Sequence, residues 1–282
     1  MKRALIFSNP HNPSWVKYQK AAVKRFTELG WQATLSDDGG PLDVILVLGG
    51  DGTLLDSAGV ARERNAPLFG INLGHLGFMA EGDVEDLDGA IARIDAGDYT
   101  VEERPTLSMR GQDADGKGWT EWALNEASIE KIDPLRMVEL LLVIDGKAVM
   151  TFGCDGLMVA TSTGSTGHAF SAGGPVLWPE VEALVVVPLA AHALFARPLV
   201  VAPTSKVAVT VRADSRSGGV VTGDSRRSRP LTAGCTVEIT RSASPVRFVR
   251  FGQAPFADRL VRKFALPVKG WRDSTASQPH VD

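Results

Sequence analysis

VILVLGGDGTLLD, residues 44–56, indicates the fold class of the N-terminal part of the chain. Its first five residues are all apolar, and three glycines then surround Asp51. A strand that is apolar throughout is typical of the centre of a parallel sheet with both faces covered. A glycine-rich loop at the carboxyl end of such a strand is where ligands of open α/β sheets gather. These loops usually bind phosphate through backbone N–H groups, so a carboxylate in the middle of the loop needs a separate explanation.

Strand and helix patterns alternate around this stretch. Apolar residues recur at steps of three and four from Trp15 to Leu29, with Ser14 as the expected helix cap and Gly30 as the expected helix end. Alternating strands and helices build a parallel sheet covered on both faces, so we expect an N-terminal α/β domain. Its expected strands are 4–7, 31–35, 44–48 and 68–72, and its expected helices are 15–29, 54–64 and 84–94.

After about residue 100 the pattern changes to short strand-like segments separated by turns. Asp145 and Gly146 lie between two of these segments, which is the signal of a β-hairpin. The predicted organisation is an α/β domain over 1–101, a β-rich domain over 102–252, a helix within 253–273 that returns to the first domain, and a disordered tail over 274–282. Expected strands of the second domain include 106–110, 139–144, 148–152, 157–160, 183–187, 206–211 and 236–239.

Composition excludes several classes of protein. Apolar residues make up 44 % and charged residues 22 % of the 282 positions, which is typical of a soluble globular protein. Apolar runs are too short to cross a bilayer, and Asn9 ends the first one too early for a signal peptide. Cys154 and Cys235 lack the spacing of a disulfide scaffold or zinc site, so the cytoplasm is the expected compartment. A pI near 6.0 without interleaved aromatic and basic residues argues against nucleic acid as a partner.

Asp51 has two chemical explanations and one structural one. The loop is neither a Walker A motif nor a G-x-G-x-x-G motif. If phosphate occupies it, the carboxylate must face either Mg²⁺ or a hydroxyl that loses its proton while attacking a phosphorus atom. Both indicate a kinase that acts on an alcohol. The structural alternative is a plain turn in which Asp51 caps the following helix.

A second glycine-rich stretch, GCDGLMVATSTGSTGHAFSAGGP, covers residues 153–175. A strand enters a segment rich in hydroxyl groups, which suit ribose hydroxyls, diphosphate oxygens or the edge of a base. The alternative is a helix N-terminus with more capping residues than it needs. The hydroxyl side chains are those of Thr161, Ser162, Thr163, Ser165 and Thr166.

Several motifs together resemble the NAD kinase family. They are GGDGT at 49–53, NLGHLGF at 72–78, NE at 125–126 and DGLMVATSTGSTGHAFSAGGP at 155–175. HALFARP at 192–198 and PFADRLVRKFALPVKGWR at 255–272 are similar to actinobacterial members. GGDGT alone also occurs in related form in diacylglycerol and sphingosine kinases and in phosphofructokinases, so the order and spacing of all the motifs carry the resemblance. It covers nearly the whole chain and implies an α/β domain, a β-rich domain and a returning C-terminal helix.

The resemblance also implies an activity. It is the phosphorylation of the 2′-hydroxyl on the adenosine ribose of NAD, with ATP or polyphosphate as donor, to give NADP. Mg²⁺ is expected on the donor phosphates rather than in a dedicated protein metal site. Homodimers or homotetramers are expected, in which a neighbouring subunit completes the site.

Site residues follow from the resemblance by position. Asp51 falls on the proton acceptor, Asn125 and Glu126 on the pair that reads adenine and its ribose hydroxyls, and Asp155 and Arg136 on positions that contact NAD. An amide suits the donor–acceptor edge of adenine, and a carboxylate suits two adjacent hydroxyls; from the residues alone, the pair could also be a polar strand edge. The loop implied to hold diphosphate contains Gly49, Gly50, Gly52 and Thr53, and the segment implied to line the dinucleotide site contains Thr163, Thr166, Gly167, His168, Ala169, Phe170 and Ser171.

Five positions depart from the family pattern and keep two alternatives open. Ser162, Gly167 and His168 replace the usual proline, alanine and tyrosine, Asp56 replaces an arginine, and Asp224 lacks the glycine that usually follows it. These changes bear on affinity, product inhibition and the preference between NAD and NADH. The alternatives are a dinucleotide-binding sensor without turnover and a lipid kinase that shares the GGDGT loop. His75, in NLGHLGF, is expected to be a loop histidine near the site.

Overall fold

The computed structural model describes residues 1–9, 13–72, 77–113, 115–252 and 255–268. His75 and the expected tail over 274–282 lie outside these residues. Contacts divide the chain into two compact units. The first unit is Met1–Glu102 together with the segment from Phe248 onward, and the second unit is Glu103–Arg247. Among the described residues, no helix combines the length and the apolar character needed to span a bilayer.

The first unit is built on a seven-stranded sheet in the order β2-β1-β3-β4-β19-β6, with β5 beside β4. Strands β1 to β4 pair in parallel, as the alternating pattern predicts, and all five residues of β3 are buried. The strands are β1 (Arg3–Ser8), β2 (Gln32–Thr34), β3 (Val44–Leu48), β4 (Leu68–Asn72), β5 (Gly82–Asp83), β6 (Thr100–Arg104) and β19 (Val246–Arg250).

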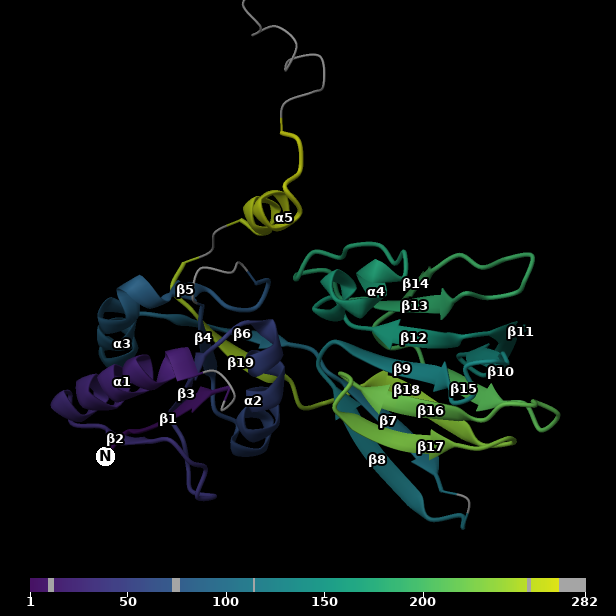
Figure 1. Cartoon of the computed structure of the whole chain (residues 1–282), viewed down its shortest axis with the longest axis horizontal. Coiled ribbons are helices and arrows are strands. Elements are labelled where there is room, and N and C mark those ends of the chain that lie inside the picture. The colour runs from purple at the N-terminus through teal and green to yellow at the C-terminus, as the bar shows by residue number, and fades with distance from the viewer. Residues whose placement is uncertain (10–12, 73–76, 114, 253–254, 269–282) are drawn as a thin grey trace, which may run out of the picture. The chain divides into compact units, whose positions relative to one another are not determined.

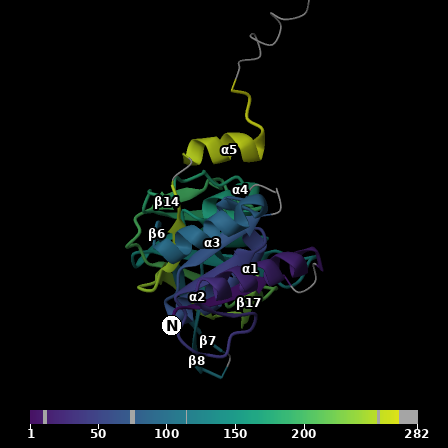
Figure 2. The same cartoon turned by 90° about the vertical axis from the view of Figure 1, so that its left-hand side faces the viewer.

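Helices cover both faces of this sheet (Figure 1). Phe26 and Ile91, from two of the helices, share a core with Leu46 of β3, and Figure 2 shows these two helices side by side. The opposite face carries Gly70, where an added Cβ would lie 2.8 Å from a methyl group of Leu54 in α2. The helices of this unit are α1 (Val16–Glu28), α2 (Asp51–Arg64), α3 (Leu87–Ala96) and α5 (Phe256–Phe264), with 3₁₀ turns η1 (Pro13–Trp15) and η2 (Val84–Asp86).

Three expected boundaries differ from the structure. Ser14 lies inside η1 and does not cap α1, whose N-cap position is Trp15. Helix α2 begins at Asp51 rather than Leu54, because Asp51, Gly52 and Thr53 already form its first turn directly after the extended Gly50. Strand β19 pairs in parallel with β4 through Phe248, although its sequence lies within the range expected for the β-rich domain. An apolar alternation predicts a strand but does not reveal which sheet the strand joins.

The second unit contains two six-stranded antiparallel sheets, in the orders β11-β10-β15-β18-β7-β8 and β14-β13-β12-β9-β16-β17. Side chains from both sheets share one apolar core. The hairpin between β10 and β11 is confirmed, with φ of 51° at Asp145 and 74° at Gly146. The strands are β7 (Leu107–Gln112), β8 (Gly118–Ala123), β9 (Glu126–Lys131), β10 (Val138–Ile144), β11 (Lys147–Cys154), β12 (Gly156–Ala160), β13 (Leu184–Leu189), β14 (Leu199–Val201), β15 (Val207–Val211), β16 (Gly219–Gly223), β17 (Arg227–Leu231) and β18 (Thr236–Arg241).

Two short helical segments follow β12. They are η3 (Gly164–Thr166) and α4 (His168–Ser171). Ala169 of α4 packs with Met158 and Val185 in a small apolar cluster on the outer side of its sheet, beside β12 and β13 (Figure 1). This packing fixes the glycine- and hydroxyl-rich segment against the sheet.

Candidate active site

The loop after β3 turns directly into α2. The N–H of Gly49 donates to the carbonyl of Ile71 at 2.9 Å, which ties the loop to the neighbouring strand β4. A Cβ at Gly49 would lie 2.3 Å from Oγ1 of Thr53, so the tight turn requires a glycine there. Gly50 is the N-cap of α2, and Asp51 therefore lies in the first helical turn. The N-terminus of a helix attracts negative charge, so this edge of the sheet suits an anionic ligand.

Asp51 does not cap its own helix. Its Oδ2 accepts a hydrogen bond from the N–H of Phe78 at 2.9 Å, and its Oδ1 accepts one from the N–H of Met79 at 3.1 Å. Both donors belong to the segment that follows β4, so the carboxylate is held across the loop. A carboxylate oxygen can accept two hydrogen bonds. Each oxygen of Asp51 can therefore accept one further hydrogen bond.

Gly77 allows this close approach. An added Cβ there would lie 2.3 Å from Oδ1 of Asp51, which is closer than real Cβ atoms come to any neighbour. Any side chain at this position would push the carboxylate away from the two N–H donors. The glycine of the NLGHLGF motif is thus explained by the position of Asp51.

Asn125 and Glu126 lie in the second unit, where a buried carboxylate fixes their backbone. Asp224 is 2 % exposed and accepts hydrogen bonds from the N–H groups of Leu124 at 2.8 Å, Asn125 at 2.7 Å and Glu126 at 3.3 Å. Arg227 forms an ion pair with it at 2.6 Å. The sequence pattern marked Asp224 only as a departure and missed this role. A single aspartate in a turn gives no sign of the distant N–H groups that it binds.

Four buried side-chain oxygens near this pair have no hydrogen-bond partner among the described residues. They are Oδ1 of Asn125, Oε2 of Glu126, Oγ of Ser162 and Oγ1 of Thr163. Leaving a buried polar atom without a partner costs about 1–3 kcal/mol, so a cluster of such atoms indicates a missing ligand. A Cβ at Gly167 would lie 3.6 Å from Nδ2 of Asn125 and 3.7 Å from Oε2 of Glu126, which shows that both side chains adjoin this glycine.

The pKa of Glu126 is raised from 4.5 to about 7. Burial is the main cause, because it disfavours the charged form. The negative charges of Asp224 and Glu130 raise this pKa further, and the positive charge of Arg226 opposes them. Glu126 therefore changes its protonation state near neutral pH.

This shift predicts a pH-dependent stability that Glu126→Gln should remove. Because the carboxyl has a higher pKa folded than unfolded, its contribution is fully present below pH 4.5 and is lost as pH rises through 7. The full change is on the order of 3 kcal/mol, from 1.36 kcal/mol for each pKa unit. Urea unfolding at pH 5 and pH 8 measures most of this change, with Glu180→Gln at an exposed position as control. An equal loss of stability with pH in the Glu126→Gln protein would contradict the assignment.

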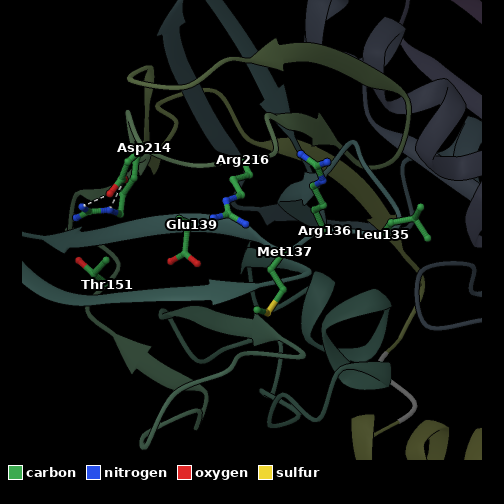
Figure 3. A pocket seen from close by; sticks show the side chains of 8 residues that line it. Leu135, Arg136, Met137, Glu139, Thr151, Asp214 and Arg216 are labelled. Carbon is green, nitrogen blue, oxygen red and sulfur yellow. Dashed lines mark hydrogen bonds and ion pairs between the residues drawn. The ribbon is translucent and has the colours of Figure 1, made fainter.

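Other expected site residues lie in different surroundings. Asp155 is paired with Lys131 at 2.6 Å. Arg136 lies 3.5 Å from Asp133 and lines an open pocket of about 1030 Å³ in the second unit, shown in Figure 3. The lining of this pocket contains none of the other expected site residues. It consists of Leu135, Arg136, Met137, Glu139, Thr151, Arg212, Asp214 and Arg216.

The segment from 166 to 171 presents a mixed surface. Thr166 donates from Oγ1 to the carbonyl of Thr163 at 3.3 Å, and Ala169 is fully buried. The side chains of His168, Phe170 and Ser171 are exposed. Among the described residues, no group of three or more His, Cys, Asp or Glu side chains could hold a metal ion.

Family models match most of the chain. The model described as the ATP-NAD kinase N-terminal domain matches residues 4–99, and the one described as the ATP-NAD kinase C-terminal domain matches residues 124–251. A protein of Thermobifida fusca named NAD kinase is 52 % identical over 84 % of this chain and 73 % of its own length. A protein of Rhodococcus erythropolis with the same name is 55 % identical over 82 % of this chain and 73 % of its own length.

Two solved structures are similar over nearly the whole chain. An NAD kinase from Archaeoglobus fulgidus in complex with ATP superposes with a TM-score of 0.74 at 29 % identity, covering 94 % of this chain and 99 % of that one. Yeast NADH kinase complexed with NADH superposes with a TM-score of 0.82 at 19 % identity, covering 96 % of this chain and 89 % of that one. At that lower identity, the second similarity concerns the fold alone.

Proposed function

Because the chain belongs to the NAD kinase family, we propose that it phosphorylates the 2′-hydroxyl of the adenosine ribose of NAD, with ATP or polyphosphate as donor, to give NADP. The observation that carries the proposal is the carboxylate of Asp51, held by two backbone N–H groups at the carboxyl edge of a buried parallel strand. A carboxylate fixed in this way suits the removal of a proton from a hydroxyl.

The second unit is proposed to recognise the adenosine. The amide of Asn125 would pair with the donor–acceptor edge of adenine, and the carboxylate of Glu126 would accept hydrogen bonds from ribose hydroxyls. The buried hydroxyls of Ser162 and Thr163, which have no hydrogen-bond partner among the described residues, are two further groups that could bind the adenosine. The remaining proposed contacts to the dinucleotide are Arg136, Asp155, Thr166, Gly167, His168, Ala169, Phe170 and Ser171.

The first unit is proposed to carry the phosphoryl transfer. Asp51 accepts the proton of the 2′-hydroxyl while the oxygen attacks the terminal phosphorus of the donor. One P–O bond forms at the ribose, and the bond to the leaving phosphate breaks. The loop formed by Gly49, Gly50, Gly52 and Thr53 is proposed to hold the diphosphate at the N-terminus of α2.

A magnesium ion belongs to the proposal as part of the donor. Kinase sites usually hold Mg²⁺ through substrate phosphates and one or two carboxylates, and Asp51 is the carboxylate that this loop offers. When bound, the ion would offset the charge that develops on the transferred phosphoryl group. The solved relative in complex with ATP supports a nucleotide donor.

Initial rates over two donors and two acceptors test the proposal. The protein is mixed with ATP or polyphosphate and with NAD or NADH, in the presence of Mg²⁺, and the product is detected with an NADP-specific dehydrogenase. We expect turnover with NAD and at least one donor. Tight binding of NADP without any turnover at micromolar protein would overturn the proposal, as would phosphorylation of diacylglycerol with none of NAD.

Assembly and location complete the proposal. We place the protein in the cytoplasm as a homodimer or homotetramer, in which a neighbouring subunit completes the site. Both cysteines are free thiols, which fits a reducing compartment. The solution mass, measured on the same preparation as the rates, gives the number of subunits.

A further inference from the structure

Two successive residues, Phe78 and Met79, connect Asp51 to arginines from the end of the chain. Their N–H groups donate to the two oxygens of Asp51. The carbonyl of Phe78 accepts a hydrogen bond from Nη1 of Arg259 in α5 at 3.1 Å, and the carbonyl of Met79 accepts one from Nη1 of Arg250 in β19 at 2.9 Å. Helix α5 belongs to the same unit as Phe78 and Met79.

The connection from Arg259 runs through a single peptide group. The carbonyl of Phe78 and the N–H of Met79 belong to the same peptide unit. A cation that binds the oxygen polarises that unit, so its N–H becomes a stronger donor to Oδ1 of Asp51. Hydrogen bonds linked in this way strengthen one another and fix the orientation of the groups that they join.

Arg259 and Arg250 differ in what else they hold. Arg250 of β19 is 4 % exposed and binds Glu102 of β6 at 2.6 Å and Glu81 at 3.3 Å, so it links two strands of the first unit. Arg259 reaches Glu81 only at 3.8 Å, and its main contact is the carbonyl of Phe78. Loss of Arg250 would therefore disturb the sheet, whereas loss of Arg259 would act mainly on the segment that holds Asp51.

Aromatic packing holds α5 in place independently of Arg259. The ring of Phe78 lies 5.9 Å from that of Phe256 and 5.7 Å from that of Phe264, one near each end of the helix. Ring pairs at these separations stabilise by about 0.5–1.5 kcal/mol beyond their buried area. Removal of the guanidinium group of Arg259 should therefore leave the helix docked.

We propose that Arg259 is a positioning residue for the phosphoryl transfer, which acts on Asp51 through the peptide between Phe78 and Met79. The helix at the C-terminal end of the first unit then helps to set the geometry of the reaction. This proposal rests on the proposed function, because it takes Asp51 as the proton acceptor. Burial and Arg250 lower the pKa of Arg259, and the negative charges of Glu81, Glu102 and Asp51 oppose that shift.

The test compares Arg259→Gln with Arg262→Gln, a matched control at an exposed position of the same helix. We expect kcat to fall about tenfold in Arg259→Gln, which corresponds to one decade of rate, while KM for NAD stays within about twofold. Arg262→Gln should match the wild type. Arg259→Lys keeps a cation and should recover part of the lost rate, which a purely structural role would not require.

Hydrogen exchange gives a readout that needs no activity. The amide of Met79 should exchange faster in Arg259→Gln than in Arg262→Gln, because its peptide loses the cation on its carbonyl. Unchanged kcat in Arg259→Gln, an equal loss in Arg262→Gln, or a change in KM alone would overturn the proposal. If Arg259→Gln does not fold, two other rates replace its rate: that of Arg259→Lys, and that of Arg259→Ala with guanidinium added. Failure of both proteins to turn over NAD would also overturn the proposal.

The two proposals fail in different ways. If the wild type does not phosphorylate NAD, the proposed function is wrong, whatever the exchange of Met79 shows. If the wild type turns over normally and Arg259→Gln equals it in rate and exchange, only the role of Arg259 is wrong.

Discussion

Asp51→Asn is expected to lower kcat by about 10²–10⁴-fold, the usual contribution of a general base. The amide keeps the size of the side chain but cannot take the proton from the hydroxyl. It also has only one acceptor oxygen, whereas two backbone N–H groups, those of Phe78 and Met79, point at the carboxylate. The variant should therefore lose about 1–3 kcal/mol of stability as well, because one donor is left without an acceptor.

The control for this variant is Asp56→Asn, which removes an exposed carboxylate from the same helix. Its rate should equal that of the wild type. Calorimetry with NAD on both variants separates binding from turnover, and we expect similar affinity in both. A kcat for Asp51→Asn within threefold of the wild type would show that Asp51 is not the base.

Gly164→Ala is expected to impair both the fold of the second unit and its affinity for NAD. A Cβ at this position would lie 2.1 Å from the carbonyl oxygen of Asn125 and 2.5 Å from its carbonyl carbon. That backbone cannot retreat easily, because Thr161 donates to the same oxygen at 2.9 Å and Asp224 binds the N–H of Asn125 at 2.7 Å. Overpacking of this kind costs about 1–3 kcal/mol.

The displaced backbone carries the amide of Asn125, which we propose binds adenine, so we also expect the Kd for NAD to rise at least about tenfold, which is roughly 1.4 kcal/mol. Urea unfolding and calorimetry measure the two effects. Gly59→Ala is the control, because its Cβ would meet nothing within 4 Å in the middle of α2. That change should stabilise the protein by about 0.5–1 kcal/mol. A Gly164→Ala protein with wild-type stability and affinity would contradict the close contact.

The sequence predicts strands β1 to β4 of the first sheet, because their signals are local, but it does not predict β5, β6 or β19. Strands β3 and β4 have the expected bounds, 44–48 and 68–72, and the hairpin at Asp145 and Gly146 follows from the residues that favour positive φ. The loop around Asp51 lies at the carboxyl end of β3, as expected, and its role in ligand binding stays a prediction. Family membership was also evident from the order of the motifs.

Contacts between distant segments could not be predicted in this way. The carboxylate of Asp224 binds three N–H groups about 100 positions earlier in the chain, as its separations of 100, 99 and 98 residues show. Arg259 reaches Phe78 across 181 residues. Neither residue has a neighbour in sequence that reveals its partner. Strand β19 was not among the expected strands, and its pairing with β4 is a further contact between distant segments.

The interpretation of Asp51 as a helix cap shows where local rules give the wrong answer. An aspartate at the start of a helix is a typical N-cap. The helix begins one residue earlier than that rule requires, with Gly50 as the N-cap, so the carboxylate is free to bind the segment after β4. Departure from a local rule at this position fits a functional site.

The central claim is that this chain places a phosphoryl group on the 2′-oxygen of the adenosine ribose, and the ³¹P spectrum of its product tests that claim most directly. The protein is incubated with NAD, ATP and Mg²⁺, and the purified dinucleotide is examined for the position of any new phosphate. We expect one phosphomonoester, coupled to the 2′-proton of the adenosine ribose. A spectrum without a new phosphomonoester, or with the phosphate on another hydroxyl, would contradict it.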